Sequence, residues 1–314
     1  MKIRWPYFVF RATLTIALLL SAVCAAQTPV AMGSNQRTSA RPVYDAVEVL
    51  QSRYAVPITY EDPILLSRGD MESWISDESN PMAFFPKRGV SALPEALVPA
   101  RTPRLDSAAL GSMLDLLHQV NADGPHFRIL ESKYGFHVAP VTSHDAGGHR
   151  VSSSSILDVN ITVPEERRMP SEHFVAVCKA VAVSSGIHVD PDGQYMDQWF
   201  ALNGLIPPKV ISAAGEEQKR QFSFAWGAQA MTARDALISL LEQSATTLSW
   251  RVLCQPSTVP QNRACTLNLG PIQIATTGPC GEPTQKALSY DRCTKCPPLR
   301  QSAPCRTVPT PQPR

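Results

Sequence analysis

Residues 222–253, FSFAWGAQAMTARDALISLLEQSATTLSWRVL, decide the expected fold of this chain. The first five and the last six residues of this stretch alternate in polarity, as half-buried strands do. Between them, Thr232 and Asp235 have the spacing of a helix capping box, with Asp in place of the usual Glu. The apolar face of the helix consists of Leu237, Leu240, Leu241 and Ala245. The stretch therefore predicts a strand, a helix and a second strand whose apolar faces pack together.

Three other segments repeat the pattern of a helix followed by a strand. The four helices are expected to begin near residues 42, 107, 171 and 232, at intervals of 65, 64 and 61 residues. The apolar stripes of the first three are Val43/Ala46/Val47/Leu50/Tyr54, Leu110/Met113/Leu114/Leu117 and Phe174/Val177/Cys178/Val181. Strands are expected at 58–60, 127–131, 136–141, 157–163 and 187–189, with a turn at 190–193. Such regular spacing indicates a duplicated unit.

The expected class is therefore α+β, built from tandem small βαβ or ββα modules with helices packed on short mixed sheets. The predicted organisation is a signal peptide at 1–26, a linker at 27–40, a first α+β region of two helix–strand units at 41–145, a second region of two βαβ-like units at 151–272 and an irregular Pro/Cys-rich tail at 273–314.

Residues 222–253 resemble the small βαβ modules at the N-termini of secretins and TonB-dependent receptors. The matching features are the first strand, a short turn, the capped helix containing ALISLLEQS and the following strand. Leu157–Val189 is similar to the same modules, and Arg41–Glu61 resembles their helix–strand half. In those families the modules assemble into rings or recognise protein partners and contain no catalytic residue. The resemblance implies a partner-binding role for this chain.

The first 26 residues have the pattern of a secretory signal peptide. Three basic residues come first, then the apolar run Ala12–Val23 and the small residues Cys24–Ala26. This run is shorter than the ~20 residues that a transmembrane helix needs. We expect cleavage after Ala26, with lipid attachment to Cys24 as the alternative. Removal of this segment leaves 26 Lys+Arg against 27 Asp+Glu and changes the net charge from +2 to −1.

Composition excludes two broad classes. A net charge of +2 over 314 residues argues against a nucleic-acid binder, and the apolar segments argue against a wholly disordered chain. No later stretch approaches the length of a membrane span. We therefore expect an exported protein, periplasmic or extracellular, without a stable transmembrane segment after cleavage.

Seven cysteines follow the predicted cleavage point. Cys178 lies on a predicted apolar stripe, so we expect a buried thiol there. The other six are candidates for disulfides: Cys254, Cys265, Cys280, Cys293, Cys296 and Cys305. Cys254 ends one predicted strand and Cys265 begins the next, and neighbouring antiparallel strands allow the Cα separation that a disulfide prefers. We predict a Cys254–Cys265 bond. For the last four, structural disulfides are favoured over zinc binding, redox activity or a disordered tail with reduced thiols.

One loop offers metal ligands. His144, Asp145 and His149 lie within six residues, and imidazole and carboxylate groups suit zinc. The alternative is a solvated connector, because two glycines separate the ligands. The sequence contains no GxSxG, HExxH, GxGxxG or P-loop motif. No motif therefore supports a nucleophilic hydrolase, a zinc protease, a dinucleotide-binding protein or a P-loop nucleotide-binding protein.

The sequence thus predicts a non-enzymatic exported protein that acts in protein–protein contact or envelope assembly, with partners in the cell envelope and no cofactor. An open sheet edge that accepts a partner strand is the expected means of contact. The alternative is a small periplasmic metal-dependent hydrolase that uses His144, Asp145 and His149. The oligomeric state stays open.

Overall fold

A computed structural model describes residues 37–73, 84–91, 105–192, 223–244, 246–257, 263–277 and 283–288. The expected signal peptide lies outside the described residues, as do Cys280, Cys293, Cys296 and Cys305. The helices are α2 (Pro42–Tyr54), α4 (Ser107–Val120), α5 (Pro170–Ser185) and α8 (Ala233–Leu241), with 3₁₀ turns η1 (Arg68–Asp70) and η3 (Ile156–Asp158).

The strands follow the same numbering along the chain. They are β1 (Arg37–Ser39), β2 (Ile58–Glu61), β3 (Met71–Ser73), β4 (Phe84–Pro86), β5 (Gly89–Ser91), β6 (His126–Glu131), β7 (Phe136–His144), β8 (Arg150–Ser152), β9 (Asn160–Arg168), β10 (His188–Asp192), β11 (Phe224–Thr232), β12 (Leu248–Cys254), β13 (Ala264–Pro271), β14 (Gln273–Thr277) and β15 (Pro283–Ala287).

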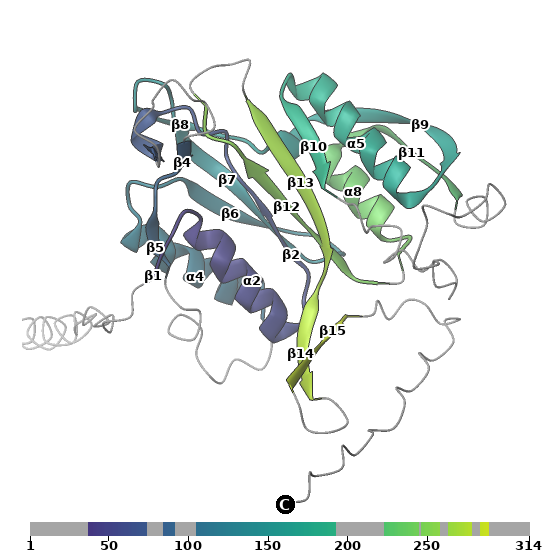
Figure 1. Cartoon of the computed structure of the whole chain (residues 1–314), viewed down its shortest axis with the longest axis horizontal. Coiled ribbons are helices and arrows are strands. Elements are labelled where there is room, and N and C mark those ends of the chain that lie inside the picture. Colours follow the sequence, from purple (N-terminus) through teal and green to yellow (C-terminus); the bar gives the residue numbers. More distant parts are fainter. Residues whose placement is uncertain are drawn as a thin grey trace, which may run out of the picture. The chain divides into compact units, whose positions relative to one another are not determined.

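A seven-stranded mixed sheet connects the two expected regions (Figure 1). Its order is β10-β13-β12-β2-β7-β6, and β8 also pairs with β7. The two halves meet where β2 runs parallel to β12, with Tyr60 opposite Arg251 and Glu61 opposite Val252. The α+β class is confirmed. The strands that follow the four helices, β2, β6, β10 and β12, all belong to this shared sheet, because β2 and β12 pair across its middle, whereas β9 and β11 form a two-stranded sheet of their own.

The first core lies on the face of the sheet covered by α2 and α4. Alternation along β2 and β7 directs Ile58, Tyr60, Phe136 and Val138 into this core. The predicted stripes of both helices are buried against them, from Val43 to Leu50 and from Leu110 to Leu117. Tyr54 is only partly buried at the edge of this core.

The second core contains the other helix pair. Residues of α5 and α8 share it with the antiparallel pair β9–β11 and with β10, β12 and β13 of the main sheet. Trp250 of β12 is completely buried there. The residues on either side of Trp250 in β12 contact the other half of the molecule. Ser249 donates to the carbonyl oxygen of Ile58, and Arg251 donates to Glu48.

Local signals set the helix ends much as expected. Asp106 Oδ1 accepts from the amide of Ala109 at the start of α4, and Thr232 Oγ1 accepts from the amide of Asp235 at the start of α8. Gly186 ends α5 in the left-handed region with φ 70°, which glycine adopts without steric cost.

Four boundaries differ from the prediction. The end of the expected linker forms β1, which pairs with β5. Residues 190–192 extend β10 instead of turning, because a proline is tolerated in an edge strand, where one side of the backbone needs no partner. Residues 156–158 form a 3₁₀ turn held by the capping box of Ser155 and Asp158, so β9 begins only at Asn160. Residues 273–287 of the expected irregular tail contain the paired strands β14 and β15.

Candidate functional site

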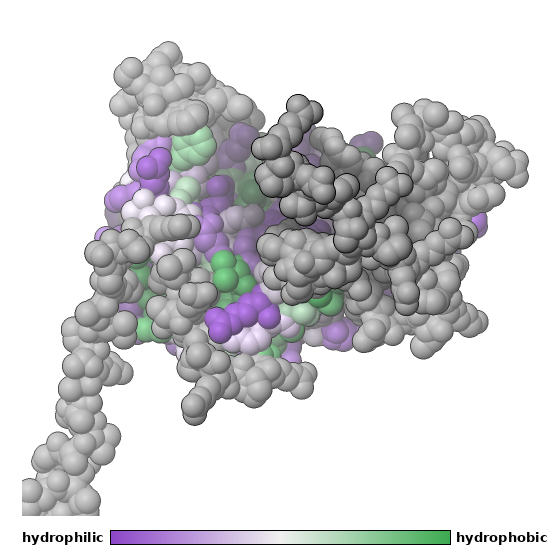
Figure 2. All heavy atoms as spheres, turned by 60° about the horizontal axis from the view of Figure 1, so that its bottom comes forward, coloured by the Kyte–Doolittle hydropathy of each residue, from purple (hydrophilic) through white to green (hydrophobic). Residues whose placement is uncertain are grey.

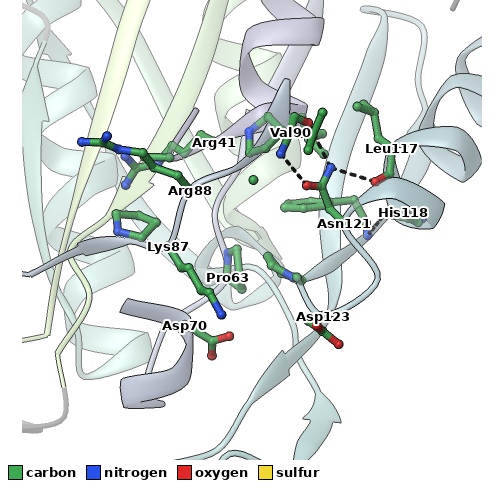
Figure 3. A pocket seen from close by; sticks show the side chains of 18 of the residues that line it. Arg41, Pro63, Asp70, Lys87, Arg88, Val90, Leu117, His118, Asn121 and Asp123 are labelled. Carbon is green, nitrogen blue, oxygen red and sulfur yellow. Dashed lines mark hydrogen bonds between the residues drawn. The ribbon is translucent and has the colours of Figure 1, made fainter. Parts of the chain in front are cut away.

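A pocket of about 330 Å³ lies beside the N-terminus of α2 (Figure 3). It is enclosed by the end of β2, η1, the connection between β4 and β5, the C-terminal end of α4 and the start of β6. Its apolar wall includes Val43, Leu65, Val90, Leu117, Phe127 and four prolines, Pro42, Pro63, Pro86 and Pro125. Because proline fixes its backbone φ angle, these positions stiffen the wall.

Helix α2 begins at this pocket. Pro42 occupies its first turn, where a missing N–H costs nothing, and the side chain of the N-cap residue Arg41 does not cap the helix. The aligned peptide dipoles place partial positive charge at this end. The helix start therefore favours a negatively charged group in the pocket.

The guanidinium of Arg41 also lines the pocket. Its Nε donates to Asp62 Oδ2 at 2.7 Å, and its Nη2 donates to the carbonyl oxygen of Cys254 at 3.1 Å. Burial lowers the pKa of Arg41, but the charge and hydrogen bond of Asp62, together with Tyr60 and Tyr44, outweigh burial, so the pKa is raised above its ordinary value. Arg41 stays charged.

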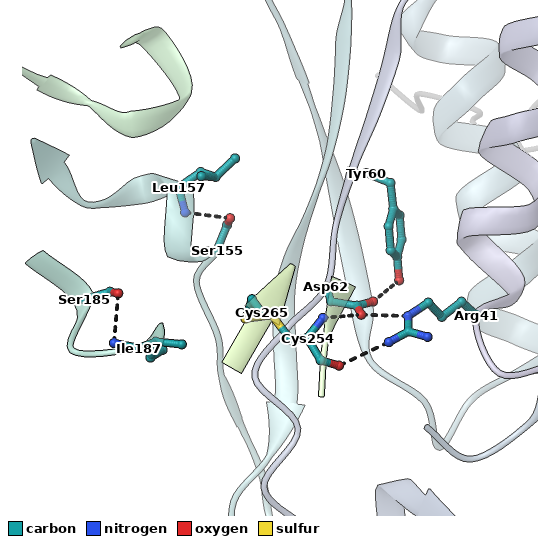
Figure 4. Close-up of a disulfide and its surroundings, with 9 residues drawn as sticks. All are labelled: Arg41, Tyr60, Asp62, Ser155, Leu157, Ser185, Ile187, Cys254 and Cys265. Atoms are coloured by element: carbon teal, nitrogen blue, oxygen red, sulfur yellow. Dashed lines mark hydrogen bonds and ion pairs between the residues drawn. A yellow bond between two sulfur atoms is a disulfide. The ribbon is translucent and has the colours of Figure 1, made fainter. Parts of the chain in front are cut away.

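Asp62 joins the pocket to the disulfide (Figure 4). Its Oδ1 accepts from the Tyr60 hydroxyl at 2.7 Å, and its Oδ2 also accepts from the amide of Cys254 at 2.9 Å. Burial, followed by the charge of Asp62, raises the pKa of Tyr60 well above its ordinary value, so the phenol remains a donor. Both carboxylate oxygens of Asp62 are thus engaged inside the protein.

Asn121 fixes the opposite wall. Its side-chain oxygen accepts from the amide of Val90 at 2.8 Å, and its Nδ2 donates to the carbonyl oxygens of Val90 and Leu117 at 3.1 and 2.9 Å. This amide behaves like a short strand partner for β5. It attaches β5 to the end of α4 along this wall of the pocket.

Asp70 brings an unsatisfied carboxylate to the pocket. Its Oδ1 and His144 Nδ1 lie 2.8 Å apart, while its Oδ2 is buried without a hydrogen-bond partner among the residues that the structure describes. The amide of Lys87 donates to the carbonyl oxygen of Asp70 at 2.7 Å, and Figure 3 shows both side chains in the same part of the pocket. Sequence reasoning missed Asp70, Lys87, Arg41 and Asn121, because no short motif contains them.

Histidines meet where α4 is followed by β6. His118 Nε2 accepts from the amide of Phe127 at 3.0 Å, and its ring stacks on that of His126 with centroids 4.5 Å apart. The nitrogens of His126 in turn lie within hydrogen-bonding distance of Arg150. Burial and the neighbouring His126 lower the pKa of His118 to about 4. His118 is therefore neutral at pH 7, which its role as an acceptor requires.

The predicted metal-ligand loop divides into two separate pairs. His144 contacts Asp70, whereas His149 lies 3.4 Å from Asp145 and is largely exposed. Asp145 Oδ1 accepts from the amides of Gly147 and His149 at 2.8 and 2.9 Å, which makes a local turn. The hydrogen bond from the His149 amide is the main reason why the pKa of Asp145 is lowered.

Across the described ranges, no three His, Cys, Asp or Glu side chains gather as metal ligands. His144 pairs with Asp70 and not with Asp145 or His149, and the metal-site interpretation of this loop stays a prediction.

The cysteines of the described ranges behave as predicted. Cys254 and Cys265 face one another across β12 and β13 and form a disulfide (Figure 4). Cys178 is free and buried in the second core, and burial raises the pKa of its thiol to about 12. At neutral pH this thiol is protonated and does not act as a nucleophile.

One serine–histidine pair resembles a nucleophile and its base. Ser132 Oγ lies 2.8 Å from His137 Nε2, and Thr59 Oγ1 lies 3.0 Å from His137 Nδ1. The third group is a hydroxyl instead of a carboxylate, and Ser132 Oγ also accepts from the amide of Tyr134 within the β6–β7 turn. His137 is buried and stacks on Trp250, as expected of a structural histidine. This group fastens the turn to β2.

The described part of the chain is an α+β protein with a disulfide, and no helix within it has the length and apolar character needed to cross a membrane. The disulfide is compatible with export. The chain matches no family model, no curated protein and no solved structure.

Proposed function

We propose that this chain is an exported, non-enzymatic protein that binds a protein partner of the cell envelope through the open edge of its main sheet. The order β9-α5-β10 followed by β11-α8-β12 supports the resemblance to the partner-binding modules of secretins and TonB-dependent receptors. The observation that carries the proposal is the difference between the two edges of the sheet.

The β10 edge is poorly suited to accept a strand. β10 pairs with β13 only, and Pro191 near its middle has no N–H to donate. Asp190 and Asp192 add exposed or partly exposed negative charge on both sides of this proline. Prolines and charges at an edge are the usual protection against strand addition.

The β6 edge carries charges on Arg128 and Glu131 but has no proline to block strand addition. It contains no glycine either, and among the described strands it pairs with β7 alone. Phe127 lies opposite Pro140 and donates its amide to His118, so its backbone faces away from β7. The alternation of antiparallel pairing then directs the N–H and C=O groups of Ile129 and Glu131 to the same outer side. These groups can pair with an added strand.

Where described residues are visible on the face in Figure 2, hydrophobic and hydrophilic side chains lie next to one another, and these visible residues do not form one broad apolar patch. Strand addition obtains its affinity from main-chain hydrogen bonds and does not require such a patch.

Site-specific cross-linking in the native envelope tests this proposal. A photo-reactive residue at Arg128, exposed on β6, is expected to capture a protein, whereas the same residue at Lys179, exposed on α5, is not. Ile129→Pro removes one outward N–H and should abolish the adduct. Ile129→Ala loses similar packing but keeps the N–H, and should retain it.

Thermal unfolding of both variants checks that they remain folded. An adduct that survives Ile129→Pro, or equal capture from positions 128 and 179, would contradict binding through the β6 edge.

A further inference from the structure

The pocket beside α2 contains opposite charges within one apolar enclosure. We propose that it binds a free α-amino acid with an apolar side chain, whose ammonium group contacts Asp70 and whose carboxylate faces the start of α2. This site is separate from the β6 edge. The proposal of an amino-acid site does not depend on whether a partner strand binds at that edge.

Asp70 supplies the negative end of the site. Its side chain is only 8% exposed, and its Oδ1 is already occupied by His144. The buried Oδ2 has no partner among the described residues. An unsatisfied buried acceptor costs roughly 1–3 kcal/mol, so it points to a water, an ion or a ligand that completes it. A carboxylate oxygen accepts most strongly from a cationic donor such as an ammonium group.

The positive end is formed by α2 and Arg41. The 13-residue helix presents its first turn without a side-chain cap, and Val43 of this turn lines the pocket. Helix starts of this kind bind carboxylates and phosphates. Arg41 uses Nε and Nη2 for Asp62 and Cys254, which leaves Nη1 without a partner within the described ranges. A ligand carboxylate can therefore receive both main-chain and guanidinium donors.

The presence of a negative group at one end of the pocket and a positive region at the other determines the class of ligand. A phosphate group would place its negative charge in the same pocket as the Asp70 carboxylate, and a simple amine would leave the helix start and Arg41 without an anion. The volume of about 330 Å³ lies near the lower limit of ligand pockets, which run from ~300 to 1,000 Å³. The apolar wall of prolines, Val90 and Leu117 suits an aliphatic side chain.

The ammonium group of Lys87 competes with the ammonium group of a ligand for contact with Asp70. Its side chain is exposed and forms no ion pair within the described ranges, yet it lies in the same part of the pocket (Figure 3). If Lys87 serves as the counterion of Asp70 in solution, the pocket has no need of a ligand ammonium group. Removal of the Lys87 charge therefore shows whether Lys87 or the ligand ammonium group is the counterion of Asp70.

Isothermal titration of the purified exported protein with four compounds tests the proposal. L-Leucine is expected to bind with a Kd of about 1 mM or tighter. 4-Methylpentanoate lacks the ammonium group and 3-methylbutylamine lacks the carboxylate, so each should bind at least about tenfold more weakly. L-Alanyl-L-leucine should also bind more weakly than leucine. Tighter binding of this dipeptide would overturn the assignment to a free amino acid.

Three variants locate the site. Asp70→Asn should weaken leucine binding about tenfold or more, which is about 1.4 kcal/mol, and leave the binding of 4-methylpentanoate unchanged. Glu165→Gln on the exposed side of β9 is the matched control and should bind leucine like the parent. Lys87→Gln should bind leucine as tightly as the parent or tighter.

Two results would overturn the proposal. One is the absence of saturable leucine binding in both the parent and Lys87→Gln. The other is a loss of leucine affinity in Lys87→Gln as large as that in Asp70→Asn. Because Lys87 is exposed, its variant folds even if Asp70→Asn does not, so the test remains decisive.

Discussion

At the residue scale, Gly89 shows how closely the pocket walls approach one another. A Cβ at this position would lie 2.4 Å from Asn121 Oδ1 and 2.9 Å from Pro42 Cγ. Since Asn121 is held by three hydrogen bonds and Pro42 has a rigid ring, neither neighbour can move away cheaply. The absence of a side chain at Gly89 lets β5 pack beside both helix ends.

We therefore expect Gly89→Ala to lower the free energy of unfolding by about 1–3 kcal/mol, the usual cost of overpacking. Gly111 in α4 is the matched control, because a Cβ there meets nothing within 4 Å. Gly111→Ala should raise stability by up to about 1 kcal/mol through helix propensity. Urea denaturation of both variants measures the two changes, and effects of the same sign would refute this account.

At the scale of elements, neutral histidines hold strands to their neighbours. His118 joins α4 to β6 through the Phe127 amide, and His137 joins β7 to β2 through Thr59. Burial, followed by Arg234, lowers the pKa of His137 to about 4, and burial and His126 do the same for His118. Protonation of either ring would place a poorly solvated charge beside these contacts.

Stability should therefore fall in acid. Both pKa values are lower in the folded state than the ordinary 6.5, so the unfolded chain binds more protons between pH 6.5 and about 4. The contribution is complete above pH 6.5 and is lost as the pH falls toward 4. The difference corresponds to at most roughly 3 kcal/mol for the buried His137, and to less for His118, which is partly exposed and therefore screened by solvent.

Urea denaturation at pH 7, 5.5 and 4 measures this dependence. His118→Gln keeps an acceptor for the Phe127 amide but does not titrate, so its stability should depend less steeply on pH. His188→Gln, at an exposed position in β10, should leave the slope unchanged. Identical slopes for the parent and His118→Gln would count against the role given to His118.

At the scale of the whole molecule, buried charges fasten the two halves of the sheet together. Glu61 of β2 is completely buried and accepts from Arg234 of α8 at 2.9 and 2.6 Å. Arg234 also contacts Asp158 at 2.6 Å, and Trp250 donates to Glu61 at 3.3 Å. This cluster spans the β2–β12 junction, and the attraction of both carboxylates keeps Arg234 charged.

We expect Arg234→Met to lower the free energy of unfolding by about 3–5 kcal/mol, because it leaves the Glu61 carboxylate buried without its partner. The double variant Glu61→Leu/Arg234→Met should recover most of this loss, since apolar residues of similar size replace the pair. Thermal and urea unfolding of the parent and both variants provide the comparison. A double variant no more stable than Arg234→Met would contradict the origin assigned to the loss.

Much of the local structure could be predicted. The Thr232 cap, the Gly186 stop and most of the buried helix stripes depend on residues close together in the chain, although Ala245 of the fourth predicted stripe lies outside the described residues. The Cys254–Cys265 bond depends on two adjacent strands and could be predicted for the same reason. The strand character of residues 190–192 could not, because it arises from pairing with β13, some 75 residues later.

Sequence by itself determined the α+β class, the helix ends and the disulfide, because periodicity, capping and hairpin pairing act over a few residues. Only the tertiary structure decided that the two regions share one sheet and that, among the described strands, β6 is at one edge of it. The same holds for the pocket, where Arg41, Asp70, Lys87 and Asn121 come from four separate segments. Such residues meet only after helices and strands pack, so no local pattern of sequence specifies their meeting.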